Sequence, residues 1–133
     1  MGLYIGKKLL KFMDKKNKKI KNAKILIMGL TFKENCKDIR NTKVVDIYKY
    51  LKQFTSNIDL YDPIAAYQDI EKIYQKKPIL YLKNKVYDSI IISVPHKKIK
   101  KMGMKKIKKL CKLNNVIFDI KSTFSIKDSD LRL

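Results

Sequence analysis

The sequence is short of the residue types on which most catalytic sites depend. Its 133 residues include no tryptophan, one histidine (His96) and two cysteines (Cys36 and Cys111). A single histidine gives no basis for a Ser-His-Asp arrangement, and neither cysteine has a second cysteine or a histidine at metal-ligand spacing. The sequence therefore predicts no metal site, and these residue types alone assign no catalytic residue.

Long apolar runs are also missing. No segment approaches the roughly 18 consecutive apolar residues of a membrane span. Residues 1–19 do not form a convincing signal peptide, because Lys7 and Lys8 interrupt the apolar positions and no small-residue cleavage site follows. We therefore expect a cytoplasmic chain, without a membrane partner, in which both cysteines are reduced thiols.

Glycine is scarce where a nucleotide-binding fold would need it most. The apolar run Ile25–Met28 ends at Gly29 and continues GLTFKEN, which supplies one glycine where the dinucleotide-binding loop G-x-G-x-x-G needs three. A P-loop is absent as well. The sequence thus lacks both standard phosphate loops at the strand end where open α/β sheets bind their ligands.

Positive charge comes almost entirely from lysine. The formal net charge is +20, yet the only arginines are Arg40 and Arg132. Base recognition and bidentate phosphate binding favour arginine, and the lysines are spread over the whole chain. We expect a solvated cationic surface that attracts anionic nucleotides, and we do not expect nucleic acid as a partner. The alternative is a stand-alone basic module that binds nucleotides or nucleic acid without catalysis.

Apolar periodicity and turn residues divide the chain into alternating helices and strands. The first strand is a continuous apolar run, which is typical of a strand buried on both faces. The segment YDSIIISV at Tyr87–Val94 is rich in β-branched and apolar residues and is stopped by Pro95, which makes it the strongest strand in the chain. The order predicts an α/β, three-layer Rossmann-like domain with a mostly parallel sheet, preceded by the end of a long helix. The expected elements are a helix over 1–16, a polar connector to 22, strand 23–28, a helix over 43–54 capped by Thr42, strand 57–61, helix 65–75, a short strand 78–82, strand 87–94, helix 96–112, strand 115–120 and a loop over 121–133.

Helical spacing also predicts which side chains face inward. In the helix over 65–75, Ile70, Ile73 and Tyr74 share the inner face, and Cys111 falls on the apolar side of the helix over 96–112. Gly6 is a poor helix former, and its small size would allow another helix to approach the first one closely. These positions are therefore expected in the core or at helix contacts.

Cys36 is the one thiol in the central loop. It lies between Lys33 and Lys37, whose charges would lower its pKa. A nucleophilic cysteine also needs a base, and nothing in the sequence brings His96 to it. We do not expect Cys36 to be a nucleophile.

Three segments together resemble a known family. They are GLTFKENCKDIRNTKVVDI, DLYDP and YDSIIISVPHKKIK, and they resemble the C-terminal UDP-sugar-binding domain of the UDP-glucose/GDP-mannose dehydrogenase family. The wording FKENC-x-DIRNTKV is most similar to the UDP-N-acetylhexosamine 6-dehydrogenases of capsule and O-antigen pathways. The likeness extends from residue 1 to about Ser122.

The resemblance implies an activity that needs more than this chain. Family members oxidise the C6 hydroxyl of a nucleotide sugar to a carboxylate with two NAD, and combine an N-terminal NAD domain, a long central helix that builds the dimer, and a C-terminal UDP-sugar domain. Residues 1–22 resemble the end of the central helix, and residues 23–133 the C-terminal domain. By this likeness the partners are a UDP-sugar, the NAD domain and a second copy, and the chain alone is not catalytic.

The resemblance also implies roles for individual residues. Phe32 and Lys33 match the family's Phe-Lys pair, which contacts the UDP-sugar, and a cation beside an aromatic ring suits sugar and phosphate oxygens. Lys121, after FDI, lies where the family places a basic substrate contact. Without the motif, Lys33 would be interpreted as one more solvated lysine.

Arg40 matches the arginine of the family's D-x-R motif, which is associated with NAD at the domain interface. The plain alternative is an ion pair with Asp38 or Asp46. Asp38 is expected to orient or cap the loop through its short side chain. Cys36 belongs to the motif, but it is not the family's catalytic cysteine, which precedes this domain.

Overall fold

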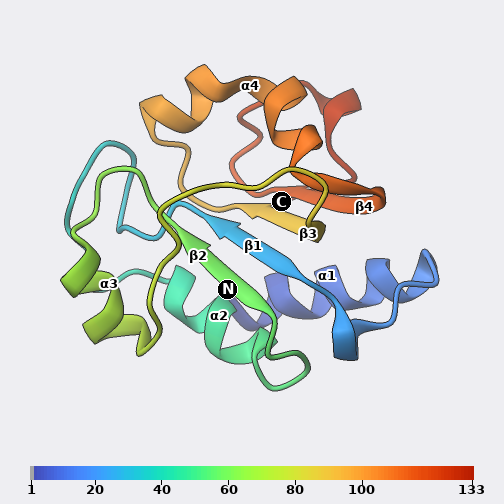
Figure 1. Ribbon diagram of the computed structural model, residues 1–133, viewed down its shortest axis with the longest axis horizontal. Coiled ribbons are helices and arrows are strands. Elements are labelled where there is room, and N and C mark those ends of the chain that lie inside the picture. Colours follow the sequence, from blue (N-terminus) through green and yellow to red (C-terminus); the bar gives the residue numbers. More distant parts are fainter. Residues whose placement is uncertain (1) are drawn as a thin grey trace.

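The computed structural model describes residues 2–133, so the start of the helix expected over 1–16 falls outside the described residues at Met1. The chain alternates helices and strands as expected, and Figure 1 shows the helices in layers on either side of one sheet. The elements are α1 (Gly2–Lys15), the short 3-10 helix η1 (Ile20–Asn22), β1 (Ile25–Met28), α2 (Val44–Leu51), β2 (Ile58–Tyr61), α3 (Tyr67–Tyr74), β3 (Tyr87–Ile92), α4 (Lys97–Lys109), β4 (Cys111–Asp119), η2 (Ile126–Asp128) and β5 (Leu131–Arg132).

The sheet is wholly parallel and has five strands in the order β2-β1-β3-β4-β5. Every residue of β1 is buried, as its unbroken apolar sequence predicts. Every residue of β3 is buried as well, including the polar Asp88 and Ser89. Alternate β1 residues serve the two faces: Ile25 and Ile27 pack in the cluster that includes α1, α2 and α3, whereas Leu26 and Met28 pack in the cluster that includes α4. This arrangement confirms the predicted three-layer α/β fold.

Helix α1 is an integral part of this core. Ile5, Leu9 and Met13 are fully buried on its inner face, and α1 packs against α2 beneath the sheet in Figure 1. A Cβ atom added at Gly6 would lie 2.8 Å from Cε2 of Tyr50 on α2. The expected close helix approach at Gly6 is confirmed.

Asp88 ties the amino end of the sheet to its surroundings. Its carboxylate accepts hydrogen bonds from Lys18 Nζ at 2.9 Å, from the Lys24 backbone N–H at 2.8 Å and from Lys112 Nζ at 3.2 Å. Partial burial alone would raise the pKa of Asp88, but these donors lower it below its usual value. The Lys18 side chain is only 10% exposed, so the pair is a partly buried one.

Two sequence-based predictions about strands are wrong. No strand forms over 78–82 in the described chain, because Pro78 has no N–H and Leu80 and Tyr81 are exposed; a single bond from Ile79 N–H to Leu60 O, 2.8 Å long, joins this segment to β2. The loop expected over 121–133 instead contains η2 and β5, where buried Leu131 pairs with Phe118.

The region after Gly103 also differs from the prediction. Gly103 has φ +78°, which breaks the regular helix in α4. The helix ends at Lys109, and Cys111 is buried as the first residue of β4, not on a helix.

Ile73, expected to face inward, is 36% exposed because α3 turns only Ile70 and Tyr74 fully into the core. Within residues 2–133, no helix combines the length and apolar character that crossing a membrane requires.

Candidate functional site

Residues 29–43 connect β1 to α2 at the carboxyl ends of the strands. Gly29, which begins this loop, has φ +89°, and a Cβ there would lie 2.6 Å from Val94 N and closer still to Val94 O. Only glycine lets the chain leave β1 beside the backbone that follows β3. The single glycine of the motif therefore serves the close approach of two protein segments.

The loop is held in shape by its own hydrogen bonds. The Phe32 N–H donates to Asp38 O at 2.9 Å, and the Asp38 carboxylate accepts the Arg40 N–H at 2.9 Å. Asn35 and Asn41 adopt left-handed backbone conformations, with φ of +58° and +57°, which asparagine tolerates better than most residues. The prediction that Asp38 orients the loop is confirmed by this bond.

The Thr42 hydroxyl joins the loop to α2. It donates to Thr31 O at 3.2 Å and accepts the Val44 N–H at 3.2 Å. The expected cap of α2 is thus present in its contact, although the residue directly before the helix is Lys43, one position later than predicted.

A cavity of about 240 Å³ opens at the ends of β1, β3 and β4, on the side of α1 and α2; we call it the strand-end cavity. Phe32 from the β1 loop and Lys121 after β4 both line it, although 89 positions separate them in sequence. Their side groups lie around a partly apolar floor. The full lining is Ile5, Thr31, Phe32, Asn41, Thr42, Lys43, Val44, Ile47, Ser93, Val94, Ile120 and Lys121.

The cavity combines apolar walls with unused polar groups. Ser93 is 3% exposed, and its Oγ has no hydrogen-bond partner among residues 2–133. A buried hydroxyl without a partner costs free energy unless a ligand or water satisfies it. Together with the cation of Lys121 and the ring of Phe32, this lining suits a ligand that has a flat or apolar part, hydroxyl groups and negative charge.

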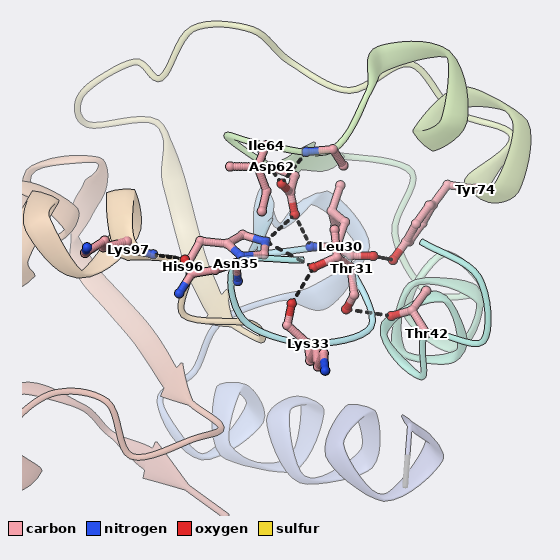
Figure 2. Close-up of polar contacts among 11 residues, drawn as sticks. Leu30, Thr31, Lys33, Asn35, Thr42, Asp62, Ile64, Tyr74, His96 and Lys97 are labelled. Atoms are coloured by element: carbon pink, nitrogen blue, oxygen red, sulfur yellow. Dashed lines mark hydrogen bonds and ion pairs between the residues drawn. The ribbon is translucent and has the colours of Figure 1, made fainter. Parts of the chain in front are cut away.

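Of the predicted site residues, Phe32 and Lys121 line the strand-end cavity, whereas Lys33 and Arg40 do not. Lys33 is exposed beside Phe32 but is not part of the cavity lining, and Figure 2 shows its side chain directed away from Asp62 and His96. Lys33 and Lys121 are both outside the set of lysines that form ion pairs within residues 2–133. That set is Lys16, Lys18, Lys24, Lys100, Lys108 and Lys112.

Arg40 lies apart from the strand-end cavity. It borders a separate surface depression with Asp38 and Asp69, and its Nε donates to Asp38 Oδ1 at 3.0 Å. The side-chain hydrogen bond from Arg40 holds the pKa of Asp38 below its usual range. The ion pair with Asp38 anticipated as the plain alternative is therefore present, and 81% of the Arg40 side chain is exposed.

Sequence reasoning missed a buried pair behind the loop, Asp62 and His96, drawn in Figure 2. Both side chains are fully buried, and His96 Nε2 lies 2.9 Å from Asp62 Oδ2. Asp62 directly follows β2 and precedes Pro63, whereas His96 lies four residues after the end of β3 and follows Pro95. The carboxyl ends of parallel strands meet at one edge of the sheet. The placement of Asp62 and His96 after two such strands was therefore the sequence signal that could have predicted their contact.

Asp62 stands where dinucleotide-binding folds place a ribose-binding carboxylate, at the end of the second strand. Its oxygens are already used: Oδ1 accepts the N–H groups of Ile64 and Ala65, and Oδ2 accepts Leu30 N–H at 2.7 Å besides His96. Burial would raise the pKa of Asp62, but these donors lower it. With Gly29 fitted against Val94, this strand end does not form a dinucleotide site of its own.

The thiols and possible metal ligands add no further centre. Cys36 is partly exposed, whereas burial raises the pKa of the Cys111 thiol to about 12. Both ring nitrogens of His96 are engaged by other groups, which supports the interpretation that Cys36 is not a nucleophile. In the part of the chain that the structure describes, no three His, Cys, Asp or Glu side chains gather as a metal site.

Fold and cavity define a class of protein: a Rossmann-like α/β domain with its opening at the carboxyl ends of a parallel sheet and no dinucleotide phosphate loop. Residues 26–126 match the family model for the UDP binding domain of the UDP-glucose/GDP-mannose dehydrogenase family. The chain belongs to that family.

Two curated relatives match the chain over its whole length. The UDP-N-acetyl-D-glucosamine 6-dehydrogenases of Pseudomonas aeruginosa and Salmonella typhi are 41% and 37% identical over 133 residues. These residues make up 32% and 31% of the two relatives, so the chain spans about a third of the length of the proteins it matches.

Solved structures of related enzymes share the fold. The UDP-D-ManNAc dehydrogenase of Pyrococcus horikoshii superposes with a TM-score of 0.75 at 20% identity, over 93% of this chain and 28% of that one. The UDP-N-acetyl-mannosamine dehydrogenase Cap5O of S. aureus gives 0.71 at 22% identity, over 99% and 29%. At such identities the likeness supports the fold alone.

Proposed function

We propose that this chain is the nucleotide-sugar-binding part of an NAD-dependent UDP-N-acetylhexosamine 6-dehydrogenase, which oxidises the sugar C6 hydroxyl to a carboxylate. Phe32, Lys33 and Lys121 contact the UDP-sugar, and the chain alone does not turn it over. The substrate class rests on the two relatives whose names give UDP-N-acetyl-D-glucosamine as the substrate. Residues 1–22 are proposed to be the end of a dimer-forming central helix, and the compartment is proposed to be the cytoplasm.

The observation that carries the proposal is the meeting of Phe32 and Lys121 at one cavity, whose lining also includes Ser93 with its buried, unpartnered hydroxyl. An aromatic ring, a cation and a buried hydroxyl match a nucleoside diphosphate sugar, which presents a planar base, phosphate oxygens and hydroxyl groups. Lys33 is exposed and follows Phe32 directly in sequence, so its flexible ammonium group can reach a phosphate without leaving an ion pair.

NAD is proposed to be held by the family's N-terminal domain and to meet this chain only at its surface. The end of β1 lacks the cradle for a dinucleotide, since Gly29 packs on Val94 and Asp62 is saturated. Arg40 is the group proposed to face the cofactor. Its exposed pairing with Asp38 is of the kind that contributes little in water, so exchanging that partner for a phosphate is inexpensive.

Calorimetric titration of the purified chain with UDP-N-acetylglucosamine tests the proposal. Binding is expected for this ligand and for UDP, and not for GDP-mannose. Replacing Lys33 or Lys121 by alanine should weaken binding roughly tenfold or more, since a hydrogen bond to a charged group contributes about 1.5–3 kcal/mol. Lys105→Ala is the matched control, an exposed lysine of α4 outside the cavity. Equal affinity of all three variants would refute the assignment.

The alternative, a stand-alone basic module, has one observation in its favour. Helix α4, KKIKKMGMKKIKK, exposes its lysines along the surface. Binding to nucleic acid through them would fall steeply with salt and would survive Lys33→Ala. Binding of the UDP-sugar should instead keep its selectivity for sugar and base at about 0.5 M salt, which is several times physiological ionic strength and screens exposed charges. NADH formation by the chain alone with a UDP-sugar would contradict the claim that it does not turn over.

A further inference from the structure

His96 joins three segments that are distant in sequence. Its imidazole is fully buried behind the loop that carries Phe32 and Lys33. Nδ1 lies 2.9 Å from the backbone nitrogen of Asn35, and Nε2 lies 2.9 Å from Asp62 Oδ2 and 3.2 Å from Thr31 Oγ1, as Figure 2 shows for the whole cluster. The ring therefore contacts the loop at two points, on either side of Phe32 and Lys33.

The partners fix the protonation of the ring. The Asn35 backbone N–H can only donate, so Nδ1 must present its lone pair. The Asp62 carboxylate can only accept, so Nε2 must carry the proton. The Thr31 hydroxyl donates to Lys33 O at 3.0 Å, which leaves its lone pair toward Nε2–H. The neutral ring with hydrogen on Nε2 is the one form that satisfies all these contacts.

Asn35 is the point at which the ring controls the loop. Its backbone N–H is held by His96, and its Oδ1 accepts the Lys97 N–H at 2.8 Å. It adopts the left-handed conformation, φ +58°, which a free loop would populate only in part. The imidazole acceptor thus stabilises a backbone shape that sets where Phe32 and Lys33 lie.

We propose that His96 is a positioning residue for the ligand loop: as an Nε2-protonated imidazole it bridges Asp62 to the Asn35 backbone and so fixes the Phe32–Lys33 segment for the UDP-sugar. The effect on the ligand rests on the proposed function, whereas the effect on the loop does not. His96 is not a catalytic residue, because both nitrogens are buried and engaged within the protein.

Two variants separate the two halves of the bridge. In His96→Asn the side-chain Oδ1 occupies the Nδ1 position and still accepts the Asn35 N–H, whereas in His96→Gln the amide N–H₂ reaches the Nε2 position and still donates to Asp62. Both are side-chain amides of similar polarity. If His96 acted on stability alone, ligand affinity in the two variants would follow their free energies of unfolding. If His96 positions the loop, ligand affinity should instead follow whether the contact with the Asn35 N–H is kept.

The experiment uses the whole chain. Because His96 is the only histidine, the ¹⁵N spectrum of its ring reports one residue, and an Nε2-protonated neutral ring is expected. Amide exchange at Asn35 should accelerate about tenfold in His96→Gln, because about one hydrogen bond is lost. It should change little in His96→Asn, which keeps the acceptor. The Gly29 amide, bonded to Tyr61 O, should exchange alike in both and serves as the control. UDP-N-acetylglucosamine affinity should fall about tenfold in His96→Gln and recover in His96→Asn.

The outcomes separate this inference from the proposed function. A ring protonated on Nδ1, or equal Asn35 exchange in the two variants, would overturn the positioning role whatever binds. If the unmodified chain shows no affinity for UDP-sugars while the ring and the Asn35 amide behave as stated, the proposed function fails and the control of the loop by His96 stands.

Discussion

Gly29 begins the loop of residues 29–43 in close contact with Val94, and its replacement by alanine gives a quantitative test of that contact. Its backbone has φ +89°, a region in which a side chain is strained. That strain costs on the order of 1–3 kcal/mol. The new Cβ would also meet the Val94 backbone, 2.6 Å from its nitrogen. Overpacking of this kind costs about 1–3 kcal/mol more, so the expected loss is about 2–6 kcal/mol.

The surroundings of Gly29 give it little room to relax. Its N–H donates to Tyr61 O, and Val94 O accepts the His96 N–H, both at 2.9 Å. Moving either segment would break contacts that hold the strand ends. The loss should therefore appear in full and not be absorbed by a small shift of the loop.

Gly103 supplies the matched control. It also has positive φ, +78°, but a Cβ there would meet nothing within 4 Å. Gly103→Ala should cost only the strain, about 1–3 kcal/mol. Urea unfolding of both variants should place Gly29→Ala lower by about 1 M in midpoint, for a slope of about 1–3 kcal/mol per M. If Gly29→Ala loses no more stability than Gly103→Ala, the contact with Val94 does not constrain the loop.

Three further predictions concern the scaffold. Gly6→Ala should cost about 1–2 kcal/mol in urea unfolding, because the Tyr50 ring must shift, and the cost should shrink in a Tyr50→Ala background. Because the folded pKa of Asp88 is lowered, its contribution to the free energy of unfolding should be complete above the unfolded pKa of about 3.9 and be lost as pH falls through the folded pKa. Asp88→Asn should lack this loss of stability in acid, and identical stability–pH profiles of the two proteins would contradict the prediction. With its pKa raised to about 12, the buried Cys111 thiol should resist iodoacetamide at a pH of about 8 while Cys36 reacts, and equal labelling rates in the native chain would contradict this.

The sequence predicted those features that follow from local pattern. An unbroken apolar run identified β1 as a strand buried on both faces, and the burial of all its residues confirms this. A β-branched run identified β3 as a strand. Helical spacing predicted the helix over residues 1–16, and the small size of Gly6 anticipated the close approach of another helix, which is α2. Since the period of burial is encoded in consecutive residues, no knowledge of distant partners was needed.

What depended on distant partners was missed. Strand β5 has two residues and forms because Asp130 bonds the Ile117 N–H at 2.8 Å and Leu131 is buried beside Phe118. No periodicity is visible in so short a segment. The Asp62–His96 pair likewise depends on the sheet, which brings together two segments that follow different strands.

The contacts at the strand ends also explain why the loop after β1 does not have the composition of a dinucleotide loop. A dinucleotide loop uses small residues so that the phosphate can approach the backbone; here the backbone near Gly29 is covered by Val94, and the acidic group at β2 is covered by His96 and backbone N–H groups. The ends of β1 and β2 therefore offer no backbone cradle for the phosphates of a dinucleotide. Ser93, whose buried hydroxyl has no hydrogen-bond partner among residues 2–133, and Lys121 lie instead after β3 and β4, in the lining of the strand-end cavity. Ligand binding at this edge is therefore expected to depend on side chains and not on a glycine-rich backbone.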